Sequence, residues 1–164
     1  MRYGLGSEHP LCDRIQLLML ILFFVVWGID CLSFFMSGYS TVIFGVVSFP
    51  LLLIGTIVFL SFGLYLISKS HKAVFNDDQT QAKLINSGVY AFVRHPMYLG
   101  ILLSCLSFLF ISVSLLSIAI WIAFFIFYDR MATYEEKSLT EILGEEYVDY
   151  QKRVPKWLLS LHWS

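Results

Sequence analysis

The chain has 164 residues, of which 58% are hydrophobic and only 14% are charged, and its formal net charge is -1. Because a soluble domain carries about 25% charged residues, this composition indicates an integral membrane protein and excludes a disordered chain. The balanced charge supplies no basic field for a polyanion, so no nucleic-acid partner is expected. The three cysteines show neither a disulfide framework nor a metal-ligand spacing, and we expect no metal.

Two apolar runs predict the first membrane spans, at residues 15–36 and 42–68. Each reaches the about 20 residues that a helix needs to cross a bilayer. Pro50 in the second run either starts the regular helix or kinks one long helix. Gly55 and Gly63 in the same run favour close helix packing. Asp30 is the one charge in the first run, and we expect it to be solvated at the outer membrane interface rather than to take part in chemistry.

The third apolar run, residues 99–127, is too long for one span. Arg94 precedes it and Arg130 follows it, so both of its ends should face the cytoplasm. We therefore predict a hairpin of two short helices, 96–112 and 115–133, that turns near Ser112 and Ser114. The whole chain, 1–164, is then a single all-α membrane domain of four transmembrane helices, with a cytoplasmic loop 69–95 and a cytoplasmic tail 134–164.

This topology has two connections on the outer side of the membrane, residues 37–41 and the turn near Ser112. None of the eleven Lys and Arg residues lies in either connection, which agrees with the topology. Both termini of this multi-pass protein are expected in the cytoplasm, at the inner membrane of a bacterium or the endoplasmic reticulum of a eukaryote. In the tail, apolar residues from Leu139 to Val154 recur at helical spacing around Gly144, which can end a helix. This pattern predicts an amphipathic helix on the membrane face, with Trp157 and Trp163 at the interface.

Two polar clusters flank the hairpin. Before it, Pro96 suits the first turn of a helix, which places His95 near the N-cap beside Arg94. This helix start favours an anionic group such as a carboxylate, although the same residue types also serve as ordinary membrane anchors. After the hairpin, Glu135 and Glu136 can hold hydroxyl and ammonium groups, or can form a solvated acidic helix start. The hairpin should bring both clusters to the same side of the membrane.

The combined motifs SGVY (87–90), RHPMYLG (94–100) and EE (135–136) resemble the isoprenylcysteine carboxyl methyltransferase family. That family belongs to a wider group of membrane methyltransferases that includes phospholipid N-methyltransferases. The resemblance implies S-adenosylmethionine as cofactor, held at the cytoplasmic face. The implied contacts are Leu84, Ile85, Tyr90, His95, Pro96, Met97, Tyr98, Glu135 and Glu136.

Two arginines are the candidate catalytic residues. Arg130 corresponds to the substrate-orienting arginine of the family, and Arg94 is the second candidate. In the family the arginine stands four residues before the first glutamate, whereas Arg130 stands five before Glu135, which turns it by about 100° on an unbroken helix. In some relatives a histidine stands shortly before the leucine that corresponds to Leu84. Residues 79–83 occupy that stretch in this chain and contain no histidine.

The expected reaction is methyl transfer to a lipophilic or lipid-linked acceptor that reaches the site from the membrane lipid. A carboxylate acceptor, as in isoprenylcysteine O-methylation, is favoured because it is ionised at neutral pH and needs orientation rather than a base. Phospholipid amines and small thiols are alternatives. A sterol-reductase-like enzyme that uses NADPH, and a membrane accessory protein without catalysis, are the remaining hypotheses.

Overall fold

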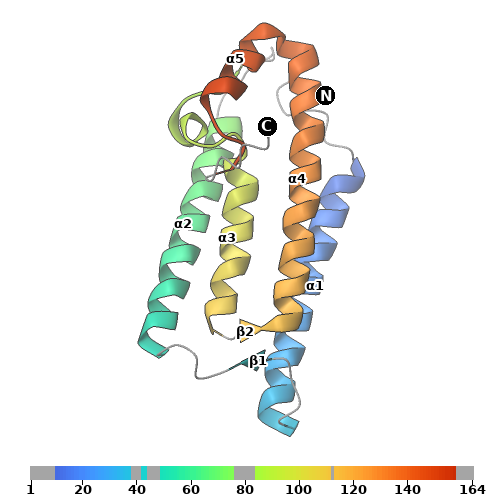
Figure 1. Ribbon diagram of the computed structural model, residues 1–164, viewed down its shortest axis with the longest axis vertical. Helices are drawn as coiled ribbons and strands as arrows, with labels where there is room; N and C mark the ends of the chain where they lie inside the picture. Colours follow the sequence, from blue (N-terminus) through green and yellow to red (C-terminus); the bar gives the residue numbers. More distant parts are fainter. Residues whose placement is uncertain (1–9, 38–41, 44–48, 76–83, 112, 158–164) are drawn as a thin grey trace.

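Helices account for nearly all of the computed structural model, which describes residues 10–37, 42–43, 49–75, 84–111 and 113–157. The elements are α1 (Pro10–Ser37), β1 (Val42–Ile43), α2 (Phe49–Phe75), the 3-10 helix η1 (Gly88–Ala91), α3 (Pro96–Ile111), β2 (Val113–Ser114), α4 (Leu115–Leu143) and α5 (Glu145–Arg153). In Figure 1, α1 to α4 run side by side and α5 caps one end, which we call the α5 end. The predicted all-helical architecture is confirmed, apart from one very short strand pair.

Three of the helices have the length and apolar composition to cross a membrane, over Arg14–Ser37, Pro50–Val74 and Leu115–Leu143. Large apolar side chains on α1 and α2, such as Leu18, Phe35 and Leu51, are exposed along these spans. A soluble protein rarely exposes so much apolar surface, whereas lipid tails cover it without penalty. The predicted integral membrane character is therefore confirmed. The helix α3 has 16 residues, or about 24 Å, and is shorter than the other three.

The boundaries of α2 differ from the predicted run 42–68. The helix begins at Phe49 and continues to Phe75, so Pro50 lies in its first turn. Proline is tolerated there because the first turn leaves its backbone N–H positions unpaired in any case. Of the two roles considered for Pro50, the structure supports the start of a regular helix. Val42 and Ile43 instead pair antiparallel with Ser114 and Val113.

Asp30 corrects an expectation, because its side chain is 8% exposed rather than solvated. The Ser114 hydroxyl donates a hydrogen bond of 2.6 Å to Asp30 Oδ2. Ser114 is also the N-cap of α4, where its Oγ accepts from the backbone N–H of Ser117 at 3.1 Å. A buried carboxylate needs such a partner. Asp30 therefore joins α1 to the start of α4 at the end of the bundle opposite to α5.

Two glycines allow α2 and α3 to approach closely, as the sequence predicts for Gly63. A Cβ atom at Gly63 would lie 2.7 Å from the carbonyl oxygen of Gly100, and one at Gly100 would lie 2.7 Å from that of Gly63. Gly55 packs against the ring of Phe110 in the same way. Backbones in membranes associate through such contacts because small residues remove the steric barrier.

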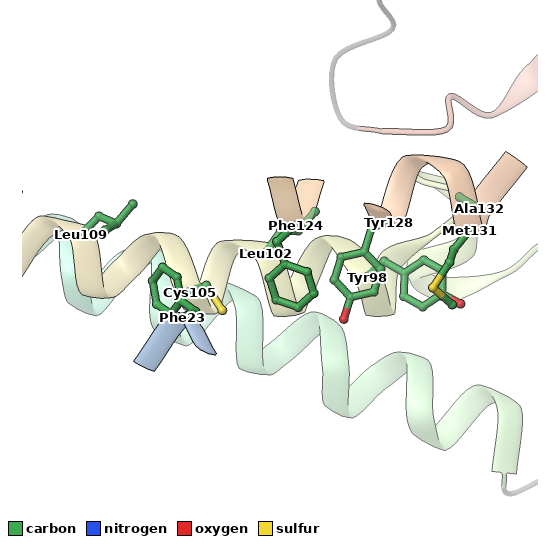
Figure 2. Packing of buried hydrophobic residues seen from close by; sticks show 9 residues of the cluster. All are labelled: Phe23, Tyr98, Leu102, Cys105, Leu109, Phe124, Tyr128, Met131 and Ala132. Atoms are coloured by element: carbon green, nitrogen blue, oxygen red, sulfur yellow. The ribbon is translucent and has the colours of Figure 1, made fainter. Parts of the chain in front are cut away.

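The main core lies between α3, α4 and one face of α1. Its fully buried members include Phe23 of α1, Leu102 of α3 and Phe124 of α4 (Figure 2). The Trp121 indole N–H donates to the carbonyl of Leu102 at 2.9 Å, which adds a polar bond between α3 and α4. The predicted hairpin is present, with α3 ending at Ile111 and α4 beginning at Leu115.

The α5 end is built by the last turns of α4, which extend beyond the predicted end of the span at 133. Gly144 has a φ of 60° and ends α4, so α5 can fold back. The buried face of α5 carries Tyr147 and Tyr150, which pack with Leu139 and Leu143 of α4. This fold-back places the chain after α5 next to the start of α3.

Candidate functional site

The start of α3 is anchored from both sides. Pro96 is fully buried in the first turn, as predicted, and the backbone N–H of Leu99 donates to the carbonyl of His95 at 3.1 Å. The N–H of Arg94 donates to the carbonyl of Pro155, behind α5, at 3.0 Å. The backbone that carries Arg94 and His95 is therefore held by the helix and by the C-terminal segment together.

Glu136 of α4 receives the first set of side-chain contacts. His95 Nε2 lies 3.0 Å from Glu136 Oε1, and Arg94 Nε lies 3.4 Å from the same oxygen. Gln151 of α5 donates to the other oxygen, Oε2, at 3.4 Å. The carboxylate is 12% exposed, so its charge is compensated mainly by protein groups rather than by water.

Glu135 of α4 receives the second set of side-chain contacts. The Tyr98 hydroxyl donates to Glu135 Oε1, and Oε2 of the same carboxylate lies 3.6 Å from His95 Nδ1. Residues of α3 and α4 that are about 40 positions apart thus form one group. We call Arg94, His95, Tyr98, Glu135 and Glu136 the acid–histidine cluster. The structure brings together the two polar groups that the hairpin was expected to join.

His95 is 7% exposed and lies between the two carboxylates. Burial lowers the pKa of His95, because removal from water disfavours the charged imidazolium, while the hydrogen bond and charge of Glu136 act in the opposite direction. The imidazole is then neutral at neutral pH, with its proton on Nε2, because a carboxylate can only accept. The neutral ring holds Glu136 without adding a positive charge.

Tyr90 closes the side of the cluster next to α2 and α5. Its carbonyl accepts a 2.7 Å hydrogen bond from the Tyr150 hydroxyl, and its own phenol interacts with the Ser70 hydroxyl of α2. Burial raises the pKa of Tyr90 to about 12, and the negative charge of Glu135 acts in the same direction. Tyr90 is therefore a neutral hydroxyl group near the Glu135 carboxylate.

The other predicted contact residues surround the cluster with apolar surface. Leu84 packs against the buried face of α5, which includes Tyr147, and Met97 packs against the core between α3 and α4. Ile85 is half-buried next to Leu84. Residues 79–83, where some relatives carry a histidine, lie outside the described residues.

Arg130 is placed differently from the rest. It is exposed, and α4 continues as a regular helix from Leu115 to Leu143 without a bulge. Glu135 and Ala132 face the cluster side of α4, and helical rotation turns Arg130 away from them. The structure therefore brings Arg94 to the cluster but not Arg130.

A second polar group, which the sequence did not reveal, lies next to the cluster. Lys156 Nζ donates to Asp129 Oδ1 at 2.7 Å and to Thr133 Oγ1 at 2.8 Å, and the Trp157 indole N–H donates to Asp129 Oδ1 at 2.9 Å. We call Asp129, Lys156 and Trp157 the clasp. These contacts join positions that are 23 to 28 residues apart and carry no sequence spacing signal.

The clasp holds Trp157 over His95, with ring centroids 6.0 Å apart. The same indole packs against the core clusters of α3 with α4 and of α2 with α3. The indole N–H of Trp157 is paired with Asp129, and its location at the membrane interface stays a prediction. Trp163 is outside the described residues.

Within the described part of the chain, no three His, Cys, Asp or Glu side chains are grouped so that they could hold a metal ion. The polar side chains of the cluster and of Tyr90 are carboxylates, phenols, one imidazole and one guanidinium group.

Comparison with known proteins identifies a family and several relatives to which this chain is similar. Residues 45–146 match the family described as phospholipid methyltransferase. Protein-S-isoprenylcysteine O-methyltransferase of Schizosaccharomyces pombe is 35% identical over 77 residues, which cover 44% of this chain and 31% of that protein. Its human counterpart is 33% identical over 56% of this chain and 32% of that protein. Methanethiol S-methyltransferase of Pseudomonas deceptionensis is 30% identical over 136 residues, or 83% of this chain and 50% of that protein.

A solved structure of the eukaryotic intramembrane Ras methyltransferase, isoprenylcysteine carboxyl methyltransferase, has the same fold. It superposes with a TM-score of 0.63 and 22% identity, over 94% of this chain and 54% of that one. The chain thus spans about a third to a half of the length of these relatives. The family match covers more than half of the chain, and it includes the acid–histidine cluster. The protein therefore belongs to the phospholipid methyltransferase family, the wider group of membrane methyltransferases that its motifs predict.

Proposed function

We propose that this protein is an S-adenosylmethionine-dependent methyltransferase of the membrane that methylates a lipophilic acceptor. The observation that carries the proposal is the acid–histidine cluster at the α5 end, where α3 and α4 bring His95, Tyr98, Glu135 and Glu136 into contact. The family match supports the same conclusion, because all five cluster residues lie within the matched range.

The donor set of the cluster fits this cofactor. Two carboxylates face one guanidinium, Arg94, and His95 is neutral, so the cluster has an excess of negative charge that suits a sulfonium cation. Glu135 and Glu136 can accept from hydroxyl and ammonium groups, and the N–H groups at the start of α3 favour a carboxylate. Leu84, Ile85, Pro96 and Met97 would supply the apolar contacts, and Tyr90 a phenol.

When bound, S-adenosylmethionine supplies a methyl group on a positively charged sulfur. An acceptor held beside it would take this methyl group with its own electron pair, and S-adenosylhomocysteine would leave. The protein then has to place the acceptor in line and exclude water, for which Trp157 and the buried rings around His95 are suited. Reaction with an ionised acceptor needs no further proton transfer by the protein.

The acceptor class proposed first is a carboxylate on a lipophilic molecule, as in isoprenylcysteine O-methylation. It is the substrate chemistry named for several relatives, and Arg94 is the cation of the cluster that would orient it. A small thiol is the second candidate. It is favoured by the methanethiol S-methyltransferase relative, which aligns with most of this chain, and by the exposed position of Arg130.

For the membrane arrangement we propose four spans, with the short helix α3 crossing beside α2, α4 and α1. The start of α1, the end of α2, the start of α3 and the end of α4 share the α5 end in Figure 1. Basic residues of the described segments, such as Lys72, Arg94 and Lys152, gather there, which favours a cytoplasmic location for this end and for both termini. The cofactor would arrive from the cytoplasm, and the acceptor from the membrane lipid.

Binding of S-adenosylhomocysteine to the purified full chain tests the cofactor. We expect binding to the unaltered protein and at least about a tenfold loss in Glu135→Gln, because a charge-assisted hydrogen bond contributes about 1.5–3 kcal/mol. Tyr134→Phe is the matched control, since Tyr134 is adjacent to Glu135 but 54% exposed. Absence of binding, together with thermal stabilisation by NADPH, would favour the reductase-like alternative and contradict the proposal.

Transfer of a labelled methyl group tests the acceptor. The probes are an S-isoprenylated cysteine with a free carboxylate, a phospholipid with a primary amine, and a small alkanethiol. Methylation of the first supports the carboxylate class, and methylation of the alkanethiol alone would replace it by the thiol class. A protein that binds S-adenosylhomocysteine but methylates no probe or total membrane lipid would match the accessory-protein alternative.

A further inference from the structure

The phenol of Tyr128 is a fully buried polar group near the acid–histidine cluster. Tyr128 lies on α4, its side chain is 0% exposed, and its hydroxyl has no hydrogen-bond partner among the described residues. A hydroxyl in this state has lost its bonds to water without replacement, which is unfavourable. Such a group in a native protein calls for an explanation, and a bound molecule is one.

Tyr128 lies directly beside the cluster. Its ring stacks on that of Tyr98 with centroids 4.7 Å apart and an angle of 29°, and the Tyr98 hydroxyl is bonded to Glu135. On the other side, the Phe124 ring stacks on Tyr128, also at 4.7 Å. Figure 2 shows the three rings in a row, with the two hydroxyl oxygens pointing in different directions. The hydroxyl of Tyr128 forms no hydrogen bond with the described residues, whereas that of Tyr98 is bonded to Glu135.

Helical geometry places Tyr128 on the side of the cluster that points away from the α5 end, towards the middle of the bundle. Tyr128, Ala132 and Glu135 are spaced i, i+4 and i+7, so they share one face of α4, and both Tyr128 and Ala132 are fully buried. Tyr128 is about two turns, or about 10 Å, deeper along α4 than Glu135. A lipophilic acceptor that approaches from the bilayer therefore meets the Tyr128 layer before it meets the carboxylates.

The charged groups near the cluster are already paired. Arg94 is beside Glu136, and Lys156 is bonded to Asp129. The other buried polar atoms without a hydrogen bond in the described segments are Trp27 Nε1 on α1, Ser117 Oγ in the first turn of α4, and Arg94 Nε. Trp27 and Ser117 belong to the part of the bundle remote from α5, and Arg94 has its carboxylate. Among the described residues next to the cluster, Tyr128 therefore has the buried hydroxyl without a hydrogen-bond partner.

We propose that Tyr128 is an acceptor-binding residue, whose hydroxyl donates a hydrogen bond to the anionic head of the acceptor beside the reacting atom. The assignment rests on the proposed methyltransferase function. A carboxylate would receive this bond at its non-reacting oxygen, and a thiolate at sulfur. The bond replaces one water molecule of the acceptor while its free electron pair attacks the methyl carbon. The phenol keeps its proton throughout, so it holds the acceptor and exchanges no proton with it.

The test compares Tyr128→Phe with the unaltered full chain in detergent or lipid nanodiscs. The substitution keeps the stacked ring and removes only the hydroxyl. We expect the KM for the S-isoprenylated cysteine probe, or for the alkanethiol probe, to rise about tenfold, the effect of one buried hydrogen bond. S-adenosylhomocysteine should bind equally well, and the thermal midpoint should stay equal or rise, because an unpaired hydroxyl is removed.

Two comparisons separate this role from a structural one. Tyr98→Phe should weaken S-adenosylhomocysteine binding instead, because its hydroxyl bonds Glu135. Tyr134→Phe, at an exposed position of α4, should change neither property. In the presence of S-adenosylhomocysteine, the acceptor probe should raise the thermal midpoint of the unaltered protein but not of Tyr128→Phe.

An unchanged KM and an unchanged stabilisation by the probe in Tyr128→Phe would overturn the assignment while leaving the methyltransferase proposal intact. A lower thermal midpoint together with weaker S-adenosylhomocysteine binding in this variant would show that the hydroxyl is structural and would also overturn it. If the unaltered protein binds neither S-adenosylhomocysteine nor any acceptor probe, the methyltransferase proposal fails first, and the assignment falls with it.

Discussion

The two sides of α3 are built on different principles. Towards α2, the helices meet through Gly63 and Gly100 at a distance that leaves no room for a side chain. Towards α4, the helices are held apart by large rings, including Tyr98 and Tyr128, and by ionic contacts at the α5 end. The first interface is stabilised by close van der Waals packing, which includes the stacked rings of Phe59 and Phe110, and the second by aromatic and ionic contacts together.

This difference shows how a helix can be both scaffold and site. The α2 interface is formed by small residues, including Gly63, Gly100 and Ser104, so its geometry depends mainly on shape. The α4 interface buries two carboxylates, which are stable only while their partners stay in place. Because α2 fixes α3 from behind, His95 and Tyr98 are presented to α4 from a rigid support, which is what a binding site needs.

Removing a carboxylate from the α4 interface should have the largest effect on stability. Glu136→Ala leaves Arg94 and His95 without their partner, and loss of one member of a buried pair costs about 3 kcal/mol. Thermal unfolding in detergent measures the change. The control is Asp149→Asn, which breaks the exposed pair with Lys152 and should leave the midpoint unchanged. Equal midpoints for both variants would show that the cluster is not a stabilising unit.

Even the smallest side chain, that of alanine, should destabilise the α2 interface. Gly63→Ala places a Cβ 2.5 Å from Ser104 Oγ and 2.7 Å from the carbonyl of Gly100, and overpacking of this kind costs about 2 kcal/mol. Gly28→Ala is the matched control, because nothing lies within 4 Å of its Cβ position. Alanine favours helix over glycine by up to about 1 kcal/mol, so this control should stabilise. The two substitutions should therefore shift the midpoint in opposite directions, and a shift in the same direction would contradict close packing at Gly63.

The clasp should contribute less, because Asp129 is 39% exposed and water screens its pair with Lys156. We expect Lys156→Met to cost about 1 kcal/mol or less. The same substitution at Lys137, which is exposed on α4, is the control and should have no effect. A further measure is limited proteolysis after Lys152 and Arg153, which should become faster in Lys156→Met if the clasp holds this segment against α4. Unchanged proteolysis would show that the remaining contacts suffice.

The smallest expected effect is a pH dependence from His95. Its folded-state pKa is lowered, so the unfolded chain binds a proton first, and stability is lost as the pH falls below the unfolded value of about 6.5. Above that pH the contribution is complete. The difference between His95→Asn and the unaltered protein in the slope of unfolding free energy against pH between about 7 and 5 measures it.

Much of this site was predictable because its parts are local. Pro96 at a helix start, and the paired glutamates on a continuous helix, follow from residue types and periodicity. The basic residues on either side of an apolar run that is too long for one span predict the hairpin, and the hairpin brings the two parts to one end. Even the outward turn of Arg130 follows from counting 100° per residue. A local bulge in α4 could have turned Arg130 back towards the cluster, but α4 is a regular helix from Leu115 to Leu143.

The remainder depends on contacts between distant positions. Asp30 and Ser114 are 84 residues apart, and the hydrogen bond between them turns an expected interfacial charge into a buried link. The clasp likewise required α5 to fold back at Gly144, which brings Trp157 next to His95. No periodicity encodes such pairs, because each partner is determined by how whole helices rotate and pack.

The sequence by itself therefore determined the class of protein, the helical hairpin and the residues that meet at its polar end, since hydrophobic length, charge distribution and helical periodicity are local quantities. Only the tertiary structure decided which groups are paired. It buried His95 between Glu135 and Glu136, turned Arg130 outward and left the Tyr128 hydroxyl without a hydrogen-bond partner among the described residues. The physical reason is that hydrogen bonding and burial depend on the rotation of α4 about its axis and its separation from α3, which the tightly packed glycines and bulky rings on the two sides of α3 set together.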